Sequence, residues 1–304
     1  MNDVYDIFDD AGVEQKRSDK KPKLSKEKFA QQMKEKRQAL FTMANEQTLK
    51  AVATPQTYLQ YLKLQSHLDY TVTNTLLVMA QAPQSTMLKD YSSWRKMNKY
   101  VSKNAKGISI LEPGNEYRRQ DGSIGMNYNP KTVFDISQLS GKRVLPPLPA
   151  KIDTKELVGA VIYHADVKPK VVPAQSQLPQ DVYFDMNQKA LYVKQGLEPE
   201  QMLAGLIREY CYVECAKHFN SRSEARFMAE SAAYMIAEKY GLTNYEPSFA
   251  NNIYGHFEGM EQKDIKGELE NIRTVKDSVC ERMEHGIYAQ QQNRQEKQKG
   301  KDVR

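Results

Sequence analysis

The stretch LAGLIREYCYVECAKHFNSRSEARFMAESAAYMIAEKYG (203–241) decides the fold of the C-terminal half of this chain. Ser221 and Glu224 have the spacing of a capping box, which opens a helix, and Gly241 suits the position just after a helix. The stretch therefore predicts two consecutive helices. The first runs from about Pro199 to His218, and the second runs from Ser221 to Gly241.

The first of these helices resembles the motif helix of zinc metallopeptidases, but it lacks the zinc ligands. His-Glu-x-x-His places two imidazoles on one helix face to bind Zn²⁺, and its glutamate serves as general base. This chain has Arg208, Glu209 and Tyr212 at the three positions. A guanidinium cannot be deprotonated to bind a metal, and a neutral phenol is a poor ligand. We therefore expect no catalytic zinc, and we expect Arg208 to replace the charge of the metal.

An alternative metal site lies on the same predicted helix. Cys211, Cys215 and His218 follow one another at i, i+4 and i+7, so they would share a helix face and offer three soft ligands. The two cysteines are equally well suited to burial as small apolar residues. Because one helix seldom supplies a complete site, burial is the favoured interpretation.

Composition bounds the class of protein. The chain has 304 residues, of which 40% are hydrophobic, with 44 basic and 38 acidic residues. Its mean hydropathy of −0.71 indicates polar stretches beside real cores. No apolar run approaches the roughly 20 residues of a membrane span, and the N-terminus lacks the apolar region of a signal peptide. Three cysteines do not make a disulfide framework. We therefore expect a cytoplasmic protein without a membrane partner.

Apolar periodicity, turn residues and prolines along the chain predict an α+β fold in two domains. Helices are expected over about 29–53, from Pro55, and over 73–82, followed by strands at 108–113 and 132–137 with turn-rich sequence between them. A hairpin is expected over 181–196. The predicted organisation is a disordered charged arm (1–38), a first domain (39–143), a Pro-rich linker (144–152), a second domain (153–255) and a charged helical or disordered tail (256–304).

The segment from Tyr91 to Ile108 combines aromatic and basic residues and contains no acidic residue. Single-stranded nucleic acid needs cations for its phosphates and flat rings on which its bases stack. The alternative is that Trp94 belongs to the core and that the lysines form an ordinary solvated face. The candidate binding residues are Tyr91, Trp94, Arg95, Lys96, Lys99, Tyr100, Lys103 and Lys106.

Several motifs in this part of the chain resemble the N-terminal domain of ArdC-type antirestriction proteins. They are Asn74 on a helix, Asp90-Tyr91-x-x-Trp94, Lys103-x-x-Lys106-Gly107-Ile108, and Val133-Phe134-Asp135-Ile136-Ser137-Gln138. The resemblance covers about residues 39–142 and implies single-stranded DNA as the partner, with Asn74 added to the binding set. The chain departs from the family in having Ser-Lys-Asn-Ala at 102–105 in place of Lys-Lys-Gly-Glu.

ArdC-type proteins continue into a metallopeptidase-like domain, and residues 153–255 fit the order of its elements. The resemblance implies a zincin-like fold in which Glu230 is a retained third ligand, or in which Arg226 stands at a lost one. One or two carboxylates without histidine do not hold catalytic zinc. Glu209 and Glu230 would then be vestigial, no cofactor is expected, and the domain would be a pseudoenzyme.

These observations predict a single-stranded DNA-binding accessory or antirestriction-like protein encoded by a plasmid, conjugative element or phage. Its metallopeptidase-like domain would be catalytically inactive. Two alternatives remain open. One is a protein-interaction module that targets a host or element-encoded restriction or regulatory protein. The other is a metallopeptidase with a non-standard metal site.

Overall fold

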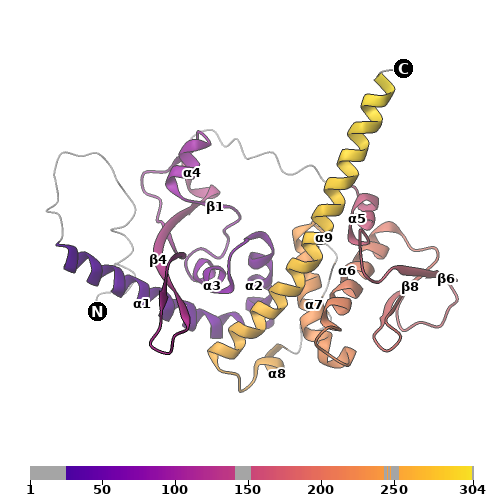
Figure 1. The fold of residues 1–304 in the computed structure, drawn as a ribbon, viewed down its shortest axis with the longest axis horizontal. Coiled ribbons are helices and arrows are strands. Elements are labelled where there is room, and N and C mark those ends of the chain that lie inside the picture. Colours follow the sequence, from indigo (N-terminus) through magenta and orange to yellow (C-terminus); the bar gives the residue numbers. More distant parts are fainter. Residues whose placement is uncertain (1–24, 141–151, 243–244, 246, 248–252, 303–304) are drawn as a thin grey trace. The chain divides into compact units, whose positions relative to one another are not determined.

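The computed structural model describes residues 25–140, 152–242, 245, 247 and 253–302. It has a mixed α+β fold with three small sheets (Figure 1). The chain divides into two compact units. The first unit comprises residues 1–144 with 260–266, and the second comprises 145–259 with 267–304. Most of the predicted linker and residues 1–24 of the predicted arm lie outside the described residues.

The helices of the first unit begin at recognisable caps. Thr54 accepts a hydrogen bond from the backbone N–H of Thr57, and Pro55 follows at the first helical position, as predicted. The first helix begins at Lys26, after the N-cap Ser25, whose hydroxyl accepts a hydrogen bond from the backbone N–H of Lys28. The helix predicted from about residue 29 therefore starts three residues earlier, and residues 26–38 of the predicted arm are helical. The helices are α1 (Lys26–Ala51), α2 (Pro55–His67), α3 (Val72–Gln81) and α4 (Tyr91–Lys96).

The main sheet of the first unit is built on one long hairpin. Strands β1 (Leu88–Lys89), β4 (Ile124–Asp135) and β3 (Ile108–Arg118) pair antiparallel in the order β1-β4-β3. Both hairpin strands are longer than predicted, because Asn129-Pro130, expected in a turn-rich stretch, lies inside β4 and pairs with β3. The turn forms at Asp121-Gly122, which lies in the same predicted turn-rich stretch, and Gly122 has φ +83 there. A smaller sheet pairs β2 (Tyr100–Val101) with β5 (Leu139–Ser140).

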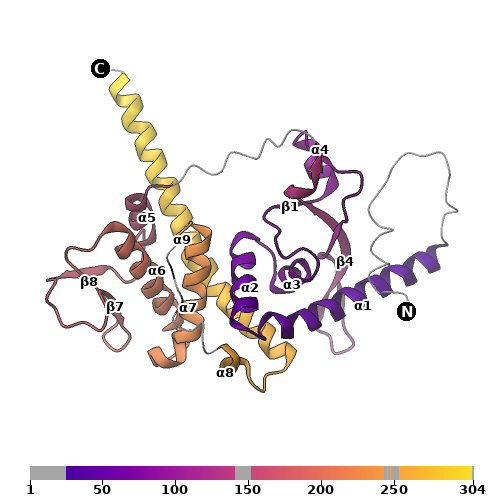
Figure 2. The same ribbon diagram turned by 180° about the vertical axis from the view of Figure 1, so that it is seen from behind.

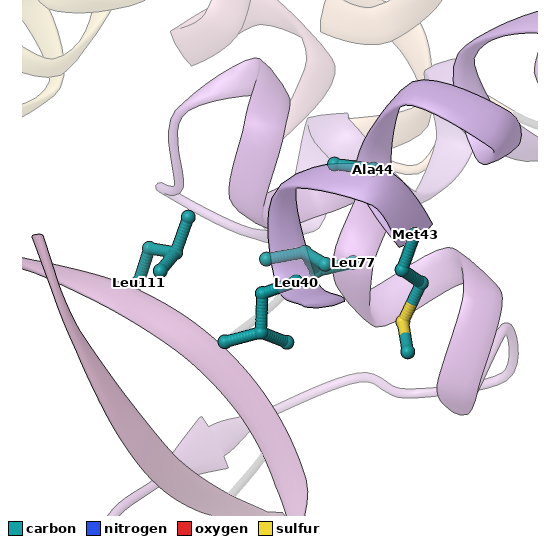
Figure 3. Close-up of a cluster of buried hydrophobic side chains, with 5 residues drawn as sticks. All are labelled: Leu40, Met43, Ala44, Leu77 and Leu111. Atoms are coloured by element: carbon teal, nitrogen blue, oxygen red, sulfur yellow. The ribbon is translucent and has the colours of Figure 1, made fainter. Parts of the chain in front are cut away.

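The core of the first unit joins α1, α3 and β3. One buried cluster consists of Leu40, Met43 and Ala44 from α1, Leu77 from α3 and Leu111 from β3 (Figure 3). Full burial of each leucine side chain contributes about 1.5–3 kcal/mol. These contacts hold α3 against the outer edge of β3.

Two side chains of α3 pair with the backbone of that edge. Asn74 donates from Nδ2 to the carbonyl of Leu111 (2.8 Å) and accepts from its N–H (2.9 Å). Gln81, seven residues later, donates to the carbonyl of Ser109 and accepts from its N–H, both at 2.9 Å. Asn74 is only 8% exposed, and both polar atoms of its amide are used. The prediction that Asn74 contacts DNA is therefore wrong, because this side chain completes the sheet.

The second unit contains a three-stranded sheet with helices on one side. Its strands have the order β6-β8-β7, with β6 parallel and β7 antiparallel to β8, and β7 and β8 form the predicted hairpin. The short strand β6 was not predicted. The elements are α5 (Thr154–Val161), β6 (Pro169–Val172), β7 (Val182–Asp185), β8 (Ala190–Lys194), α6 (Pro199–Cys215), α7 (Arg222–Lys239), α8 (Ile253–Phe257) and α9 (Gln262–Asp302).

Helix α6 lies between the β7–β8 hairpin and α7 (Figure 2). Gly205 permits this close packing, since a Cβ there would lie 2.6 Å from the side chain of Val182. The predicted cap of α7 is present, as Ser221 accepts from the N–H of Glu224, and Gly241 has φ +72 after the helix. In the predicted helical or disordered tail, helix α9 extends to Asp302.

Among the described residues, no helix has the length and apolar character needed to cross a membrane.

The pairing of β3 by Asn74 predicts a large stability loss in Asn74→Ala. The substitution leaves the N–H and carbonyl of Leu111 without partners at a buried position, which should lower the free energy of unfolding by about 2–4 kcal/mol. Urea unfolding followed by circular dichroism measures this loss. The control is Gln56→Ala, an exposed amide on α2, which should change stability by less than about 0.5 kcal/mol. Equal effects of the two substitutions would refute the role of Asn74.

Candidate functional site

The centre of the second unit is a buried, fully paired carboxylate. Glu209 on α6 is 0% exposed. Its Oε1 accepts from Arg208 Nε at 2.9 Å and from Arg222 Nη2 at 3.1 Å. Its Oε2 accepts from Arg222 Nη1 at 2.6 Å and from the backbone N–H of Phe184 at 2.8 Å. Both oxygens are therefore occupied by strong donors, as a buried charge requires.

Arg222, in the first turn of α7, donates two of the three side-chain hydrogen bonds that Glu209 accepts. Its guanidinium carbon lies 3.7 Å from the ring centroid of Tyr212 and 4.7 Å from that of Tyr183, so it makes cation–π contacts with both rings. Burial alone would lower the pKa of Arg222, but the Glu209 carboxylate outweighs it and the net pKa is raised. Arg222 therefore stays positively charged beside Glu209 at physiological pH.

The same three side chains pair the outer edge of β7. Arg208 Nη2 donates to the carbonyl of Val182 at 3.2 Å, and Arg222 Nη1 donates to the carbonyl of Phe184 at 3.0 Å. Glu209 accepts from the N–H of Phe184. The other side of β7 pairs with β8. An open strand edge is a template for another extended chain, so this cluster closes that template.

Arg208, which pairs with Glu209, was predicted from the sequence, whereas Arg222 was not. A signal was present in the sequence. A cation in the first turn of a helix opposes the helix dipole, so an arginine directly after the N-cap Ser221 indicates a nearby carboxylate partner. The sequence could not show that the partner would be Glu209 on the preceding helix.

Tyr212 and Glu230 meet beside this cluster. The Tyr212 hydroxyl donates to Glu230 Oε1 at 3.4 Å, and Arg226 Nε lies at the same distance from that oxygen. Burial and the nearby Glu230 carboxylate raise the pKa of Tyr212 well above its usual value, so the phenol stays neutral. A neutral phenol keeps Glu230 hydrogen-bonded without ligating a metal.

The cysteine–histidine alternative is wrong. Helix α6 ends at Cys215, so His218 lies beyond the helix and is exposed, whereas both cysteines are buried. Burial raises the pKa of Cys215 to about 12 and raises that of Cys211 well above its usual value, so both remain thiols. Across the described part of the chain, no three His, Cys, Asp or Glu side chains are arranged to hold a metal ion.

The first unit presents a basic-aromatic strip, which we define as Tyr91, Arg95, Lys96, Lys99, Tyr100, Lys103 and Lys106. Tyr91 and Arg95 are four residues apart on α4 and so share a face. Arg95 in turn lies over the Tyr100 ring, 5.4 Å from its centroid. Tyr91 is 49% exposed and Tyr100 is 52% exposed. The four lysines are exposed except Lys99, which is half-buried.

Trp94 lies beneath this strip rather than in it. It is 1% exposed, and its Nε1 donates to the carbonyl of Phe134 at 2.9 Å. The prediction that Trp94 stacks on DNA bases is therefore wrong, and the alternative of a core residue is correct. Asp90 caps α4 by accepting from the N–H of Ser93 at 2.7 Å. Together, Trp94 and Asp90 fix α4 against β4 with Tyr91 and Arg95 outward.

The Phe-Asp-Ile-Ser-Gln motif positions the lysine-bearing loop. Asp135 accepts from the N–H groups of Thr86, Met87 and Ser137 at 2.8–3.1 Å. Gln138 accepts from Asp135 N–H at 2.8 Å and donates to the carbonyl of Lys106 at 2.6 Å. The motif thus holds the loop that carries Lys103 and Lys106 in place.

The two-unit α+β fold is similar to that of a plasmid antirestriction protein. In particular, it is similar to the metal-free crystal structure of the ArdC protein from the R388 plasmid, with a TM-score of 0.55 and 13% identity over 81% of this chain and 98% of that one. The Mn(II)-bound structure of that protein gives a TM-score of 0.52 and 14% identity over 79% and 98%. Comparison with protein-family models and with curated proteins gives no match. The predicted resemblance to ArdC-type proteins is confirmed as a likeness of fold.

Removal of Arg222 should destabilise the second unit. In Arg222→Ala, Glu209 stays buried with only part of its charge compensated, which should cost about 3–5 kcal/mol of the free energy of unfolding. Thermal and urea unfolding measure the loss. The matched control is Arg226→Ala, because that side chain is 55% exposed and should cost less than about 1 kcal/mol. If the two variants lose equal stability, the central role of Arg222 is refuted.

Proposed function

We propose that this chain is a single-stranded DNA-binding accessory protein with an antirestriction role, encoded by a plasmid, conjugative element or phage. The observation that supports it most is the basic-aromatic strip. Two exposed tyrosines flank an arginine there, lysines surround them, and the sequence from Tyr91 to Ile108 has no acidic residue.

The strip has the chemistry that single-stranded nucleic acid requires. Exposed rings accept stacked bases, at about 1–3 kcal/mol per base, without regard to base identity. Arginine and lysine side chains neutralise phosphates and release counterions, which makes binding sensitive to salt. Tyr91, Arg95 and Tyr100 form a continuous row, since Arg95 contacts the Tyr100 ring and lies one turn from Tyr91. We therefore propose sequence-tolerant binding along this row.

The fold supports the antirestriction part of the proposal. The similar solved structures are of a plasmid antirestriction protein, and the likeness extends over most of both chains. At 13–14% identity the likeness concerns the fold alone. The antirestriction role of this chain is thus part of the proposal.

For the second unit we propose a zincin-like, non-catalytic scaffold. One structure of the R388 ArdC protein contains Mn(II). Metal binding at Glu209 does not fit this chain, because the Arg222 guanidinium pairs with both oxygens of Glu209 and lies over the Tyr212 ring. A metal cation would have to displace this guanidinium and would meet neither histidine nor free carboxylate at the motif.

Fluorescence anisotropy on a labelled single-stranded oligonucleotide tests the DNA proposal. Tyr91→Ala and Tyr100→Ala should each weaken binding by about 5- to 100-fold, the loss of one stacked base. Lys96→Ala or Lys103→Ala should reduce the salt dependence by about one phosphate contact. The control is Lys50→Ala, which removes an exposed lysine on α1, outside the strip, and should cause little change. Failure of the wild type to bind at moderate salt would refute the proposal.

Metal titration tests the scaffold proposal. Mn(II) or Zn²⁺ in modest excess should leave the melting temperature of the protein unchanged, because a ligand that binds only the folded state would raise it. Elemental analysis of the purified protein should find neither metal in stoichiometric amount. Stoichiometric metal that is lost in Glu209→Gln would contradict the proposal and favour a non-standard metallopeptidase.

A further inference from the structure

The distal half of the β3–β4 hairpin, residues 113–128, forms an exposed arm. It projects past α1 in both views of the chain (Figures 1 and 2). Large apolar side chains on this arm are exposed to solvent: Ile124 is 67% exposed, Tyr117 44%, Met126 38% and Tyr128 36%. Such a concentration on two strands marks an interaction surface.

The outer edge of β3 is open along this arm. Nearer the core, Asn74 and Gln81 pair the outward backbone groups of Leu111 and Ser109. At the turn, Arg119 N–H donates to the carbonyl of Ser123, so by antiparallel alternation Tyr117 pairs inward and Glu116 and Arg118 direct their backbone groups outward. Within the described residues, no side chain pairs these two backbones, and neither side chain has an ion pair.

We propose that this edge pairs with the same edge of a second copy of the chain. An antiparallel pairing centred on Tyr117 places Glu116 opposite Arg118 of the second copy, and Arg118 opposite Glu116 of the second copy. Opposite charges that face each other across strands are favourable, and like charges are unfavourable. The two hairpins would then form one four-stranded sheet with a two-fold axis at Tyr117.

The faces of the hairpin on which the side chains lie also suit this pairing. Glu116 and Arg118 are the cross-strand partners of Met126 and Ile124, so these four share one face of the hairpin. Tyr117 lies on the other face, against Gly125, where an added Cβ would meet its ring at 2.6 Å. Pairing therefore places the charged pairs at the centre of one face, with Ile124 and Met126 of each hairpin on the outer strand beside them, and leaves each Tyr117 ring over Gly125 of its own hairpin on the other face.

The charge pattern favours a second copy over other partners. A two-fold interface requires a self-complementary surface, and an acid and a base placed symmetrically about one residue on a strand edge meet that requirement. A nucleic acid partner is disfavoured because Glu116 would face phosphates. An unrelated protein would need no such symmetry. This inference is independent of DNA binding by the strip.

Sedimentation velocity of the full chain over about 1–100 µM, without DNA, tests the proposal, since a small interface gives a dissociation constant in this range. The wild type should shift from monomer to dimer. Glu116→Arg and Arg118→Glu each place like charges opposite each other and should weaken the dimer about tenfold or more. The double variant Glu116→Arg/Arg118→Glu restores opposite charges and should recover the wild-type dimer.

The matched control is Arg119→Glu, which makes the same charge change on the arm but at the turn, where Arg119 contacts Ser123. This variant should dimerise like the wild type. All three substituted positions are exposed, and circular dichroism should show an unchanged fold in all four variants. A wild type that stays monomeric at the highest concentration overturns the proposal. So does a double variant that is no better than the single ones, or a control that is as weak as they are.

Discussion

Every backbone N–H and carbonyl at a covered sheet edge needs a partner, and in this protein side chains from neighbouring elements provide it. Asn74 and Gln81 pair backbone groups at the edge of β3, and Trp94 donates to the carbonyl of Phe134 on β4. The arginine–glutamate cluster pairs backbone groups of β7. The sheets are too small to bury their edges by adding strands. The helices must therefore lie where their polar side chains can reach those edges, and the arrangement of each unit follows from this constraint.

This constraint separates the residues that look functional from those that can contact a ligand. Asn74, Trp94 and Glu209 all have types common at binding or catalytic sites, yet each uses at least one polar atom on the backbone of a strand. Once such side chains are assigned to the sheets, the exposed tyrosines, arginine and lysines of the strip remain. The buried polar residues therefore stabilise the fold, and the surface of α4 and the loop after it is where we propose binding.

Local signals were sufficient for much of the fold. Capping residues correctly located the starts of α2 and α7, and alternation correctly located the β7–β8 hairpin. The same signals failed at Asn129-Pro130, because a proline is tolerated where its missing N–H would face outward from a strand edge. For the tail the polar sequence left helix and disorder open, and helix α9 continues to Asp302. For the candidate site, the loss of the zinc ligands could be predicted, since it depends only on which side chains stand at 208 and 212.

The sequence by itself determined the residue types at the metallopeptidase-like motif, the basic-aromatic character of 91–108, and the caps and turns that set most elements. These properties are local, because they depend on residues within a turn or two of each other. Only the tertiary structure decided that Arg222 would be the partner of Glu209, that Trp94 would lie beneath the strip, and that Asn74 would pair with Leu111. Each of those contacts joins residues 13 to 40 positions apart, and burial and pairing across such distances arise only when the elements pack.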